Sequence, residues 1–277
     1  MILSEINIYP IKSLKGISLK EAKTERRGLR FDRRWMLVDE KNELFTQREF
    51  PRMATIETRI GENGLQVSQN GNNLEIPFSP NGDETARVRV WSSKCAARVY
   101  ENPVNEWFSD VLGTKCKLVL MPEETERRVN YFYAVHKDDH VSFADGYPFL
   151  LIGENSLADL NSRLEDDLPM NRFRPNFVVK DAEPFAEDGW KKIRIGESVF
   201  HVVKPCARCV ITTIDQATGE KGGKEPLKTL ASFRVPKRSL KKKILFGQNL
   251  IVEKAGEVLR VGDEIEVLET KNKPKFL

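Results

Sequence analysis

Three Asn-Gly pairs in the first hundred residues constrain the fold more than any other feature of the sequence. They stand at positions 63–64, 70–71 and 81–82, and the β-prone runs LQVSQ, LEIPF and ARVRVW lie between and after them. Asn-Gly adopts the positive φ angles of two-residue hairpin turns at low cost. We therefore expect a meander of antiparallel strands in this part of the chain.

Helices are expected at three places between further β-branched runs. The first covers residues 102–113, with Asn102 as the N-cap, Pro103 in the first turn and Gly113 as the stop. The second begins in SLADLNSRLE with Ser156 as its N-cap, and the third lies in EPLKTLASFR. The runs PFLLIGE, PNFVVK, SVFHVVK, CVITTID, NLIVEK and EIEVL favour buried β structure. The pattern indicates a β-rich fold of barrels or coiled sheets.

Composition excludes several classes of protein. The 45 basic and 41 acidic side chains are too balanced for a nucleic-acid binder, and the basic run at residues 236–243 is expected to be a solvated loop. No apolar run approaches the roughly 20 residues of a membrane helix, and the N-terminus lacks a signal-peptide layout. Four cysteines are too few for a disulfide scaffold. We expect a cytoplasmic protein with free thiols.

Two of these cysteines, Cys206 and Cys209, are separated by two residues and admit several interpretations. A redox pair should open a helix, but CVITTID is a poor helix former. A structural zinc needs two more nearby ligands, and Cys95 and Cys116 form no second knuckle. His136 has the i,i+4 partner His140 but lies in a charged segment that favours an exposed loop. A single thiolate beside cations is the interpretation that remains.

Basic residues near turns extend this last interpretation. Arg208 and Lys204 flank the cysteines, and their charge should favour a thiolate. Further basic residues stand beside other strands, at Lys12, Arg33, Arg34, Arg172 and Arg174. Together they suit a soft metal that is held by sulfur and carried on an anionic organic ligand, because guanidinium groups bind phosphate in a bidentate manner.

Longer strings of the sequence resemble a known family. KPCARCVITTIDQATGEKGGKEPLKTLASFR, LFGQNLIV and VGDEIEVL resemble the MOSC domain, named for the C-terminal domain of molybdenum cofactor sulfurase. IYPIKSLKGISLKEA, GLRFDRRWMLVD and FTQREFPRMA resemble the β-barrel domain that precedes it, and PFLLIGENSLADLNSRL with NRFRPNFVV matches the same family. The resemblance implies an α+β, β-rich fold, with an N-terminal β-barrel-like domain (1–120) followed by a MOSC β-barrel domain with a few helices (121–270).

The resemblance also implies a site. The family includes the mitochondrial amidoxime-reducing component and bacterial enzymes that detoxify N-hydroxylated bases, and it implies a molybdenum cofactor (molybdopterin) whose metal is bound by Cys209. The remaining implied positions are cofactor contacts at Lys12, Ser13, Arg33, Arg174, Arg208, Thr212, Thr213 and Asn249, with Asp145 near the metal as a catalytic residue. One cofactor must touch these groups, so they should converge on one cleft between the domains. Cys206 is expected to be a packing or turn residue.

The implied function is the reduction of N-hydroxylated compounds, such as hydroxylaminopurines and amidoximes, with electrons from a separate reductase. No cysteine follows Cys209, so an iron–sulfur cluster does not fit the C-terminal part. Ala207 departs from relatives that have a serine there. Pyridoxal phosphate binding is a further keyword that the resemblance brings. Two alternatives stay open: a sulfur carrier with a Cys209 persulfide, and a module that binds or delivers the cofactor.

Overall fold

The expected meander is present in part in the computed structural model, which describes residues 1–237 and 240–276. Strands β6 (Glu57–Ile60), β7 (Gly64–Gln69) and β8 (Asn72–Pro77) form an antiparallel three-stranded sheet. Asn70 and Gly71 make the tight turn between β7 and β8 with φ of 50° and 82°. The pair at 63–64 ends a longer loop. The pair at 81–82 leads out of this sheet into another, so it is not the hairpin turn that we expected.

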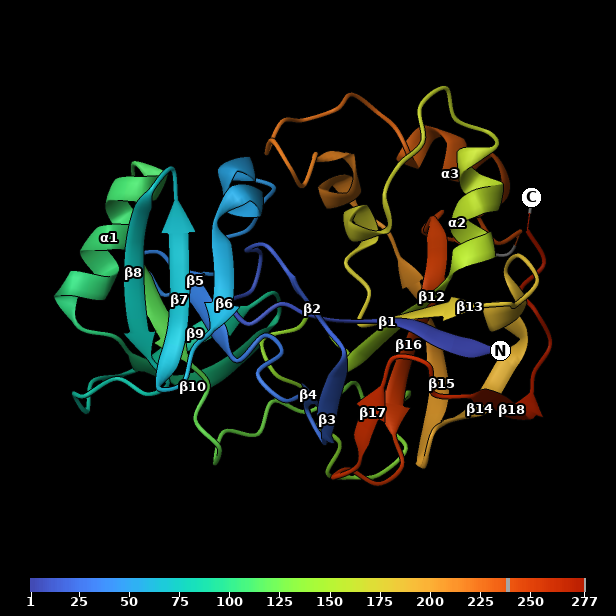
Figure 1. Ribbon diagram of the computed structural model, residues 1–277, viewed down its shortest axis with the longest axis horizontal. Helices are drawn as coiled ribbons and strands as arrows, with labels where there is room; N and C mark the ends of the chain where they lie inside the picture. Colours follow the sequence, from blue (N-terminus) through green and yellow to red (C-terminus); the bar gives the residue numbers. More distant parts are fainter. Residues whose placement is uncertain (238–239, 277) are drawn as a thin grey trace.

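A second sheet and a helix complete the lobe on the left of Figure 1. The sheet has the order β5 (Trp35–Val38), β11 (Lys117–Leu120), β10 (Ser93–Val99) and β9 (Thr85–Val90). Helix α1 (Asn102–Leu112) packs its apolar side chains Val104, Trp107 and Phe108 into the core of this lobe. The predicted helix is confirmed, and Gly113 ends it with φ 70°. Its N-cap is Glu101 and not Asn102, because the helix begins one residue earlier than expected.

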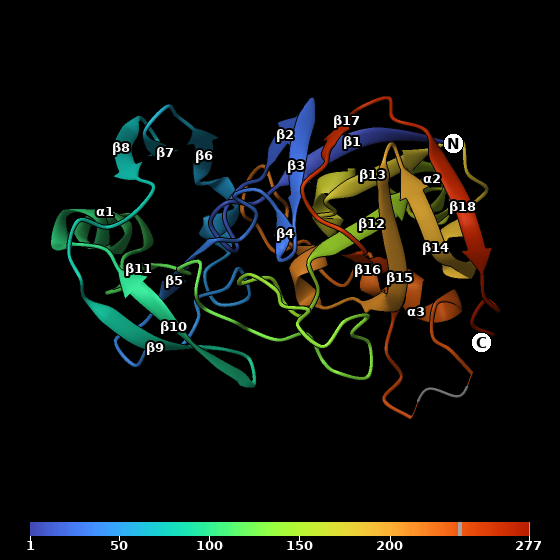
Figure 2. The same ribbon diagram turned by 90° about the horizontal axis from the view of Figure 1, so that it is seen from below.

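The largest sheet belongs to the other lobe and has eight strands (Figure 2). Its spatial order is β18 (Ile265–Thr270), β14 (Trp190–Ile195), β15 (Ser198–Ala207), β16 (Leu245–Val252), β12 (Phe149–Gly153), β13 (Phe177–Lys180), β1 (Ile2–Ile8) and β2 (Ile17–Leu19). Strands β12 and β13 are parallel, and the other neighbours are antiparallel. A small sheet adds β17 (Val258–Arg260), β3 (Glu21–Glu25) and β4 (Gly28–Leu29). The molecule is therefore a β-rich α+β fold of curled sheets, as expected.

The first strands of the chain pair with strands of the C-terminal half. Strand β1 pairs with β13, and β3 pairs with β17, so the N-terminal residues contribute to the core of the C-terminal lobe. This pairing crosses the division near residue 120, which stays a prediction from the sequence. It has one structural consequence: the turns that follow β1 and β4 stand at the boundary between the lobes.

Two further helices lie on the C-terminal lobe, and they differ in detail from the expectation. Helix α2 (Glu154–Asn161) begins two residues before Ser156, which is buried inside it and donates to Glu187 instead of capping. Helix α3 (Leu227–Phe233) is where it was expected. CVITTID contains a 3-10 helix, η4 (Val210–Thr213), and not a strand. Three other 3-10 helices are η1 (Pro51–Thr55), η2 (Met170–Phe173) and η3 (Ala186–Gly189).

Long apolar helices are absent from the described part of the chain: none there could cross a membrane. His136 and His140 lie in the connection before β12, as expected for a loop. The basic run at 236–243 includes Arg238 and Ser239, which lie outside the described residues.

Candidate functional site

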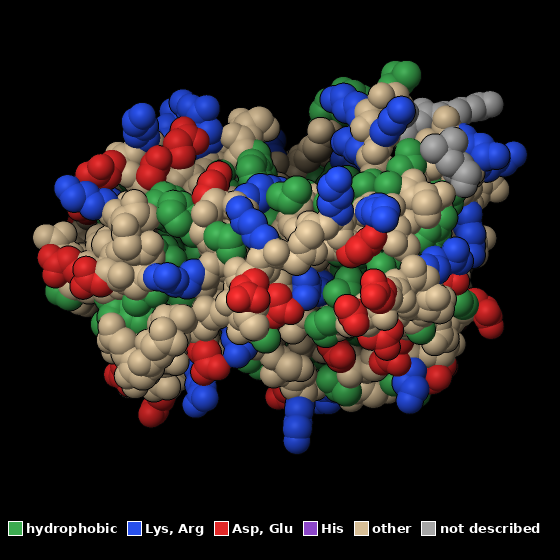
Figure 3. Space-filling model, turned by 90° about the horizontal axis from the view of Figure 1, so that it is seen from above, with side chains coloured by type: hydrophobic (Ala, Val, Ile, Leu, Met, Phe, Trp, Pro, Cys, Tyr) green, Lys and Arg blue, Asp and Glu red, His purple; other side chains and the backbone are tan. Residues whose placement is uncertain are grey.

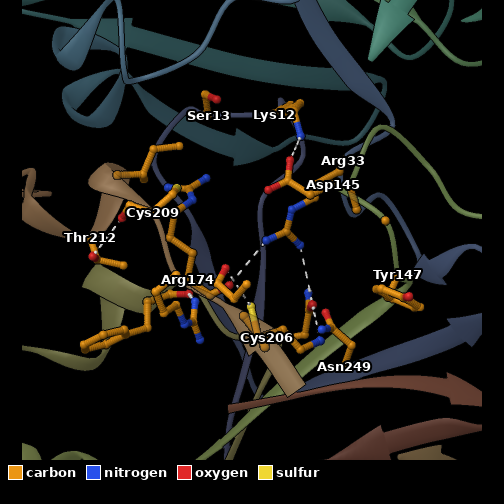
Figure 4. Close-up of a pocket in the computed structure, with 18 of the residues that line it drawn as sticks. Lys12, Ser13, Arg33, Asp145, Tyr147, Arg174, Cys206, Cys209, Thr212 and Asn249 are labelled. Atoms are coloured by element: carbon orange, nitrogen blue, oxygen red, sulfur yellow. Dashed lines mark hydrogen bonds and ion pairs between the residues drawn. The ribbon is translucent and has the colours of Figure 1, made fainter. Parts of the chain in front are cut away.

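A cleft between the two lobes collects almost every residue that the sequence singled out (Figure 4). Cys209, Asp145, Lys12 and Arg33 line it together. So do the other expected contacts Ser13, Arg174, Arg208, Thr212 and Asn249. Thr213, Lys204 and Arg34 are the exceptions, because none of them is among the lining residues. The Thr213 hydroxyl donates to the carbonyl of Val210, Lys204 Nζ lies 4.4 Å from the centroid of the Tyr133 ring, and Arg34 pairs with Glu123. The expected convergence on one cleft is confirmed as geometry, while the role of each residue stays a proposal.

Cys209 stands just before η4 and receives a hydrogen bond from the opposite half of the chain. Arg48, in the turn just before η1, donates from Nη2 to the Cys209 sulfur at 3.1 Å. The sequence pointed to Arg208 as the cation beside the thiol. Arg208 instead donates to the carbonyl oxygens of Phe246 (2.7 Å) and Phe173 (3.0 Å). It therefore stabilises the wall of the cleft and leaves the contact with the thiol to Arg48.

Trp91 connects this arginine to the acidic side of the cleft. The Arg48 guanidinium lies over the Trp91 ring at 4.4 Å from its centroid, and the Trp91 Nε1 donates to Asp145 Oδ1 at 3.0 Å. The same oxygen accepts from Lys12 Nζ at 2.6 Å. Arg48, Trp91, Asp145 and Lys12 thus form one chain of contacts across the cleft, from the cysteine to the ion pair.

The ion pair joins a buried lysine to an exposed carboxylate. Loss of water in the cleft opposes ionisation of Asp145, but Lys12 and Trp91 stabilise the carboxylate and hold its pKa well below its usual range. Burial lowers the pKa of Lys12, although Asp145 opposes this shift. The Asp145 side chain is 66% exposed and that of Lys12 only 7%, so solvent screens the pair from the side of the carboxylate.

Two arginines that line the cleft share one buried tyrosine ring. The guanidinium carbons of Arg33 and Arg174 lie 4.5 and 4.2 Å from the centroid of the Tyr9 ring. Asp32 pairs with Arg33 at 2.6 Å, whereas Arg174 donates to neutral acceptors, Gln216 Oε1 and the carbonyl of Leu14. Burial lowers the pKa of Arg174 to about 10 and raises that of Tyr9 to about 12. Arg174 is therefore a half-buried guanidinium without a carboxylate ion-pair partner among the described residues.

The charge of the cleft favours an anionic ligand. Five basic residues line it, Lys12, Arg33, Arg172, Arg174 and Arg208, and the single acidic residue is Asp145. Figure 3 shows Lys and Arg side chains on both sides of the middle of the molecule. Five buried guanidinium nitrogens of the described residues lack a hydrogen-bond partner, and three of them belong to arginines that line the cleft or contact Cys209: Arg48 Nη1, Arg172 Nε and Arg208 Nη2. Because buried donors are normally satisfied, this observation indicates room for an acceptor from outside the protein.

The cleft offers few protein ligands for a metal. The described residues contain no group of three or more His, Cys, Asp and Glu side chains that could hold a metal ion. Cys209 offers one soft sulfur donor beside a cationic wall. This set fits a soft metal that brings most of its own ligands on an anionic carrier, such as the molybdenum cofactor, and it does not fit a metal bound by protein ligands alone.

Several residues that line the cleft or contact its side chains were not predicted from the sequence as part of the site: Arg48, Trp91, Tyr9, Asn176 and Cys206. Cys206 lines the cleft near the end of β15, so its description as a packing or turn residue was incomplete. Burial raises the pKa of its thiol. Arg48 lies within FTQREFPRMA, one of the strings that carried the family resemblance, which was the available signal for it. No local pattern pointed to Trp91.

Comparison with known proteins gives the same result along the chain. A family model described as MOSC N-terminal beta barrel domain matches residues 1–115, and one described as MOSC domain matches residues 138–266. Mitochondrial amidoxime-reducing component 1 of Danio rerio is 35% identical over 278 residues, which are 95% of this chain and 84% of that protein. The protein of the same name from Mus musculus is 35% identical over 279 residues (96% and 82%). Molybdenum cofactor sulfurase of Oryza sativa subsp. japonica is 33% identical over 288 residues, 95% of this chain but 35% of the sulfurase.

Proposed function

Because this chain belongs to the family that combines a MOSC N-terminal β-barrel domain with a MOSC domain, we propose that it is a molybdenum-cofactor-dependent oxidoreductase. Its substrates are N-hydroxylated compounds, and its electrons come from a separate reductase. The amidoxime-reducing components among its relatives support this reaction class. A cytoplasmic location stays a prediction.

The convergence of one cysteine and several cations on one cleft carries the proposal. Lys12 and Arg33 follow strands of the N-terminal half, Arg174 and Cys209 belong to the C-terminal half, and all four line the same cleft. A ligand that has both an anionic group and a thiophilic metal would use both kinds of donor. The unpartnered nitrogens of Arg48 and Arg208 add donor capacity for the same ligand.

Each residue has a distinct part in this proposal. Cys209 would bind the metal, and Arg33 and Arg174 would hold the anionic end of the cofactor near the Tyr9 ring. When bound, the cofactor supplies a metal that exchanges two electrons and an oxygen atom with the substrate. Asp145 would orient the substrate through its carboxylate, which Lys12 and Trp91 keep ionised and fixed in place.

The source of the electrons must be another protein. Neither a dinucleotide-binding fingerprint nor a cysteine set for an iron–sulfur cluster occurs in the sequence. We therefore expect a reductase that docks near the cleft, with a small N-hydroxylated molecule as the second partner.

The match to a molybdenum cofactor sulfurase supports a second candidate, a sulfur carrier in which Cys209 bears a persulfide. The metal content of protein purified from a cofactor-producing host separates the two. About one molybdenum per chain, with reduction of 6-hydroxylaminopurine by a reduced viologen, supports the oxidoreductase. A metal-free protein that releases thiocyanate when treated with cyanide supports the carrier and contradicts the oxidoreductase.

A further inference from the structure

Trp91 occupies an unusual backbone position at the edge of the cleft. It is the first residue of the two-residue turn between β9 and β10, with φ 56°. The first central position of such a turn favours glycine when its φ is positive, and a bulky residue there is uncommon. Strained residues of this kind gather at functional sites, where the surrounding structure holds them in place. Here a tryptophan replaces the residue that the turn would favour.

The position directs a large aromatic surface into the cleft. Among the exposed large apolar side chains of the described residues, Trp91 is the one that lines the cleft, and it is 39% exposed. Arg48 covers one face of the ring and Asp145 holds the Nε1 edge. The contacts of Trp91 with the protein thus leave an open aromatic surface, and within the described residues no other ring or cation lies over it.

The position of Arg48 limits what can stack on that surface. A cation on one face attracts electron density from the ring, so a second cation on the other face would be disfavoured. A neutral planar ring meets no such penalty and gains the usual offset stacking. Lys12 and Arg33 nearby add to the repulsion of cationic ligands.

Asp145 supplies a polar contact beside the same surface. Within the described residues, both hydrogen bonds of its carboxylate use Oδ1, from Lys12 and from Trp91. Oδ2 therefore remains available to accept from a ligand N–H or O–H group at the edge of a stacked ring. Arg48 also keeps this aromatic surface close to the cysteine. The Trp91 ring centroid lies at most about 9 Å from the Cys209 sulfur, because the path through the Arg48 guanidinium consists of its two contact distances and one C–N bond.

We propose that Trp91 and the Oδ2 atom of Asp145 form a stacking subsite that selects neutral planar aromatic substrates with an exocyclic N–H or O–H group. This inference rests on the proposed function for the reaction, but the binding it describes does not require turnover. It makes Trp91 a specificity-determining residue. Hydroxylated nucleobases and aromatic amidoximes fit the subsite, and small aliphatic amidoximes do not use it.

The test compares an aromatic substrate with an aliphatic one in three variants of the cofactor-loaded protein. Trp91→Gly removes the ring and suits the turn, so it should fold. Trp91→Phe keeps a stacking surface. Phe132→Ala is the matched control, because Phe132 is 75% exposed and lies outside the cleft lining. The measurement is kcat/KM for benzamidoxime relative to acetamidoxime, with a reduced viologen as donor.

Trp91→Gly should lower this ratio about tenfold, since stacking of a base on an aromatic side chain contributes 1–3 kcal/mol and 1.4 kcal/mol is tenfold. Trp91→Phe should retain most of the ratio, and Phe132→Ala all of it. If the wild type reduces the amidoximes and Trp91→Gly shows the same kcat/KM ratio as the wild type, the subsite is contradicted and the proposed function remains.

Binding of adenine, a neutral ring that cannot be reduced in this way, provides the second measurement. Calorimetry should show weaker binding to Trp91→Gly than to the wild type by a similar factor. If the wild type reduces neither amidoxime but binds adenine through Trp91, the proposed function fails and the subsite stands. Absence of adenine binding to the folded wild type contradicts the subsite.

Discussion

Substitution of Gly247 by alanine should destabilise the wall of the cleft by a predictable amount. Gly247 lies in β16 with φ 79°, a backbone conformation that side-chain-bearing residues avoid. An added Cβ would stand 2.7 Å from Ile152 Cγ1, 2.9 Å from the carbonyl oxygen of Leu151 and 3.2 Å from Arg208 Nη2. Two of these contacts are shorter than carbon atoms tolerate, and one of the two involves backbone, which cannot rotate away.

The expected loss in free energy of unfolding has two contributions. The positive φ costs roughly 1–2 kcal/mol for alanine, and overpacking in a closed environment costs roughly 1–3 kcal/mol more. We expect Gly247→Ala to lower the free energy of unfolding by about 2–5 kcal/mol. Gly113→Ala provides the matched control, because Gly113 has φ 70° and no atom within 4 Å of the added Cβ. Gly113→Ala should show the cost of the positive φ alone.

Urea unfolding of both variants, followed by circular dichroism, measures the difference. Gly247→Ala should exceed Gly113→Ala by at least 1 kcal/mol, in the range expected for overpacking. It should also reduce the molybdenum content, because Arg208 would be pushed from the carbonyls that position it. If the two variants lose the same free energy of unfolding, the close contacts of the added Cβ at Gly247 do not destabilise the protein and the reasoning is wrong.

Three further predictions concern the site. Cys209→Ser should abolish molybdenum binding and reductase activity, since a hydroxyl is a hard and largely protonated ligand, while Cys206→Ser should keep the metal; equal loss of activity in both with intact metal would contradict this. Asp145→Asn should alter the pH dependence of stability. The depressed pKa of Asp145 stabilises the fold above roughly pH 4 and this contribution fades as the pH falls, so the two proteins should differ at neutral pH and converge in acid in urea titrations. NADH alone should not support reduction of 6-hydroxylaminopurine, and turnover should appear on addition of a reductase; robust turnover with NADH alone refutes a separate electron donor.

Local sequence patterns predicted most helices and strands, but they predicted the residues at which these elements begin and end less well. Apolar periodicity identified α1, and its left-handed end at Gly113 followed from glycine chemistry. The predicted caps at Asn102 and Ser156 were wrong, because each helix begins earlier in the chain than expected; Ser156 uses its hydroxyl to hold the buried Glu187. CVITTID became a 3-10 turn although its residues favour strands, since the chain must turn there to place Cys209 in the cleft. Tertiary context overrode propensity at each of these positions.

The site could be predicted only from longer strings of the sequence, and the reason is physical. Ten non-glycine residues of the described chain have positive φ, and four of them line the cleft: Ser13, Arg33, Trp91 and Arg174. At these positions the local preference of the residue disagrees with its backbone, so short-range rules predict another conformation. Long-range contacts resolve the disagreement, such as the bond from Arg174 to Leu14 and that from Trp91 to Asp145. The cleft thus gathers residues whose conformation the rest of the fold must impose, which is expected where function outweighs local stability.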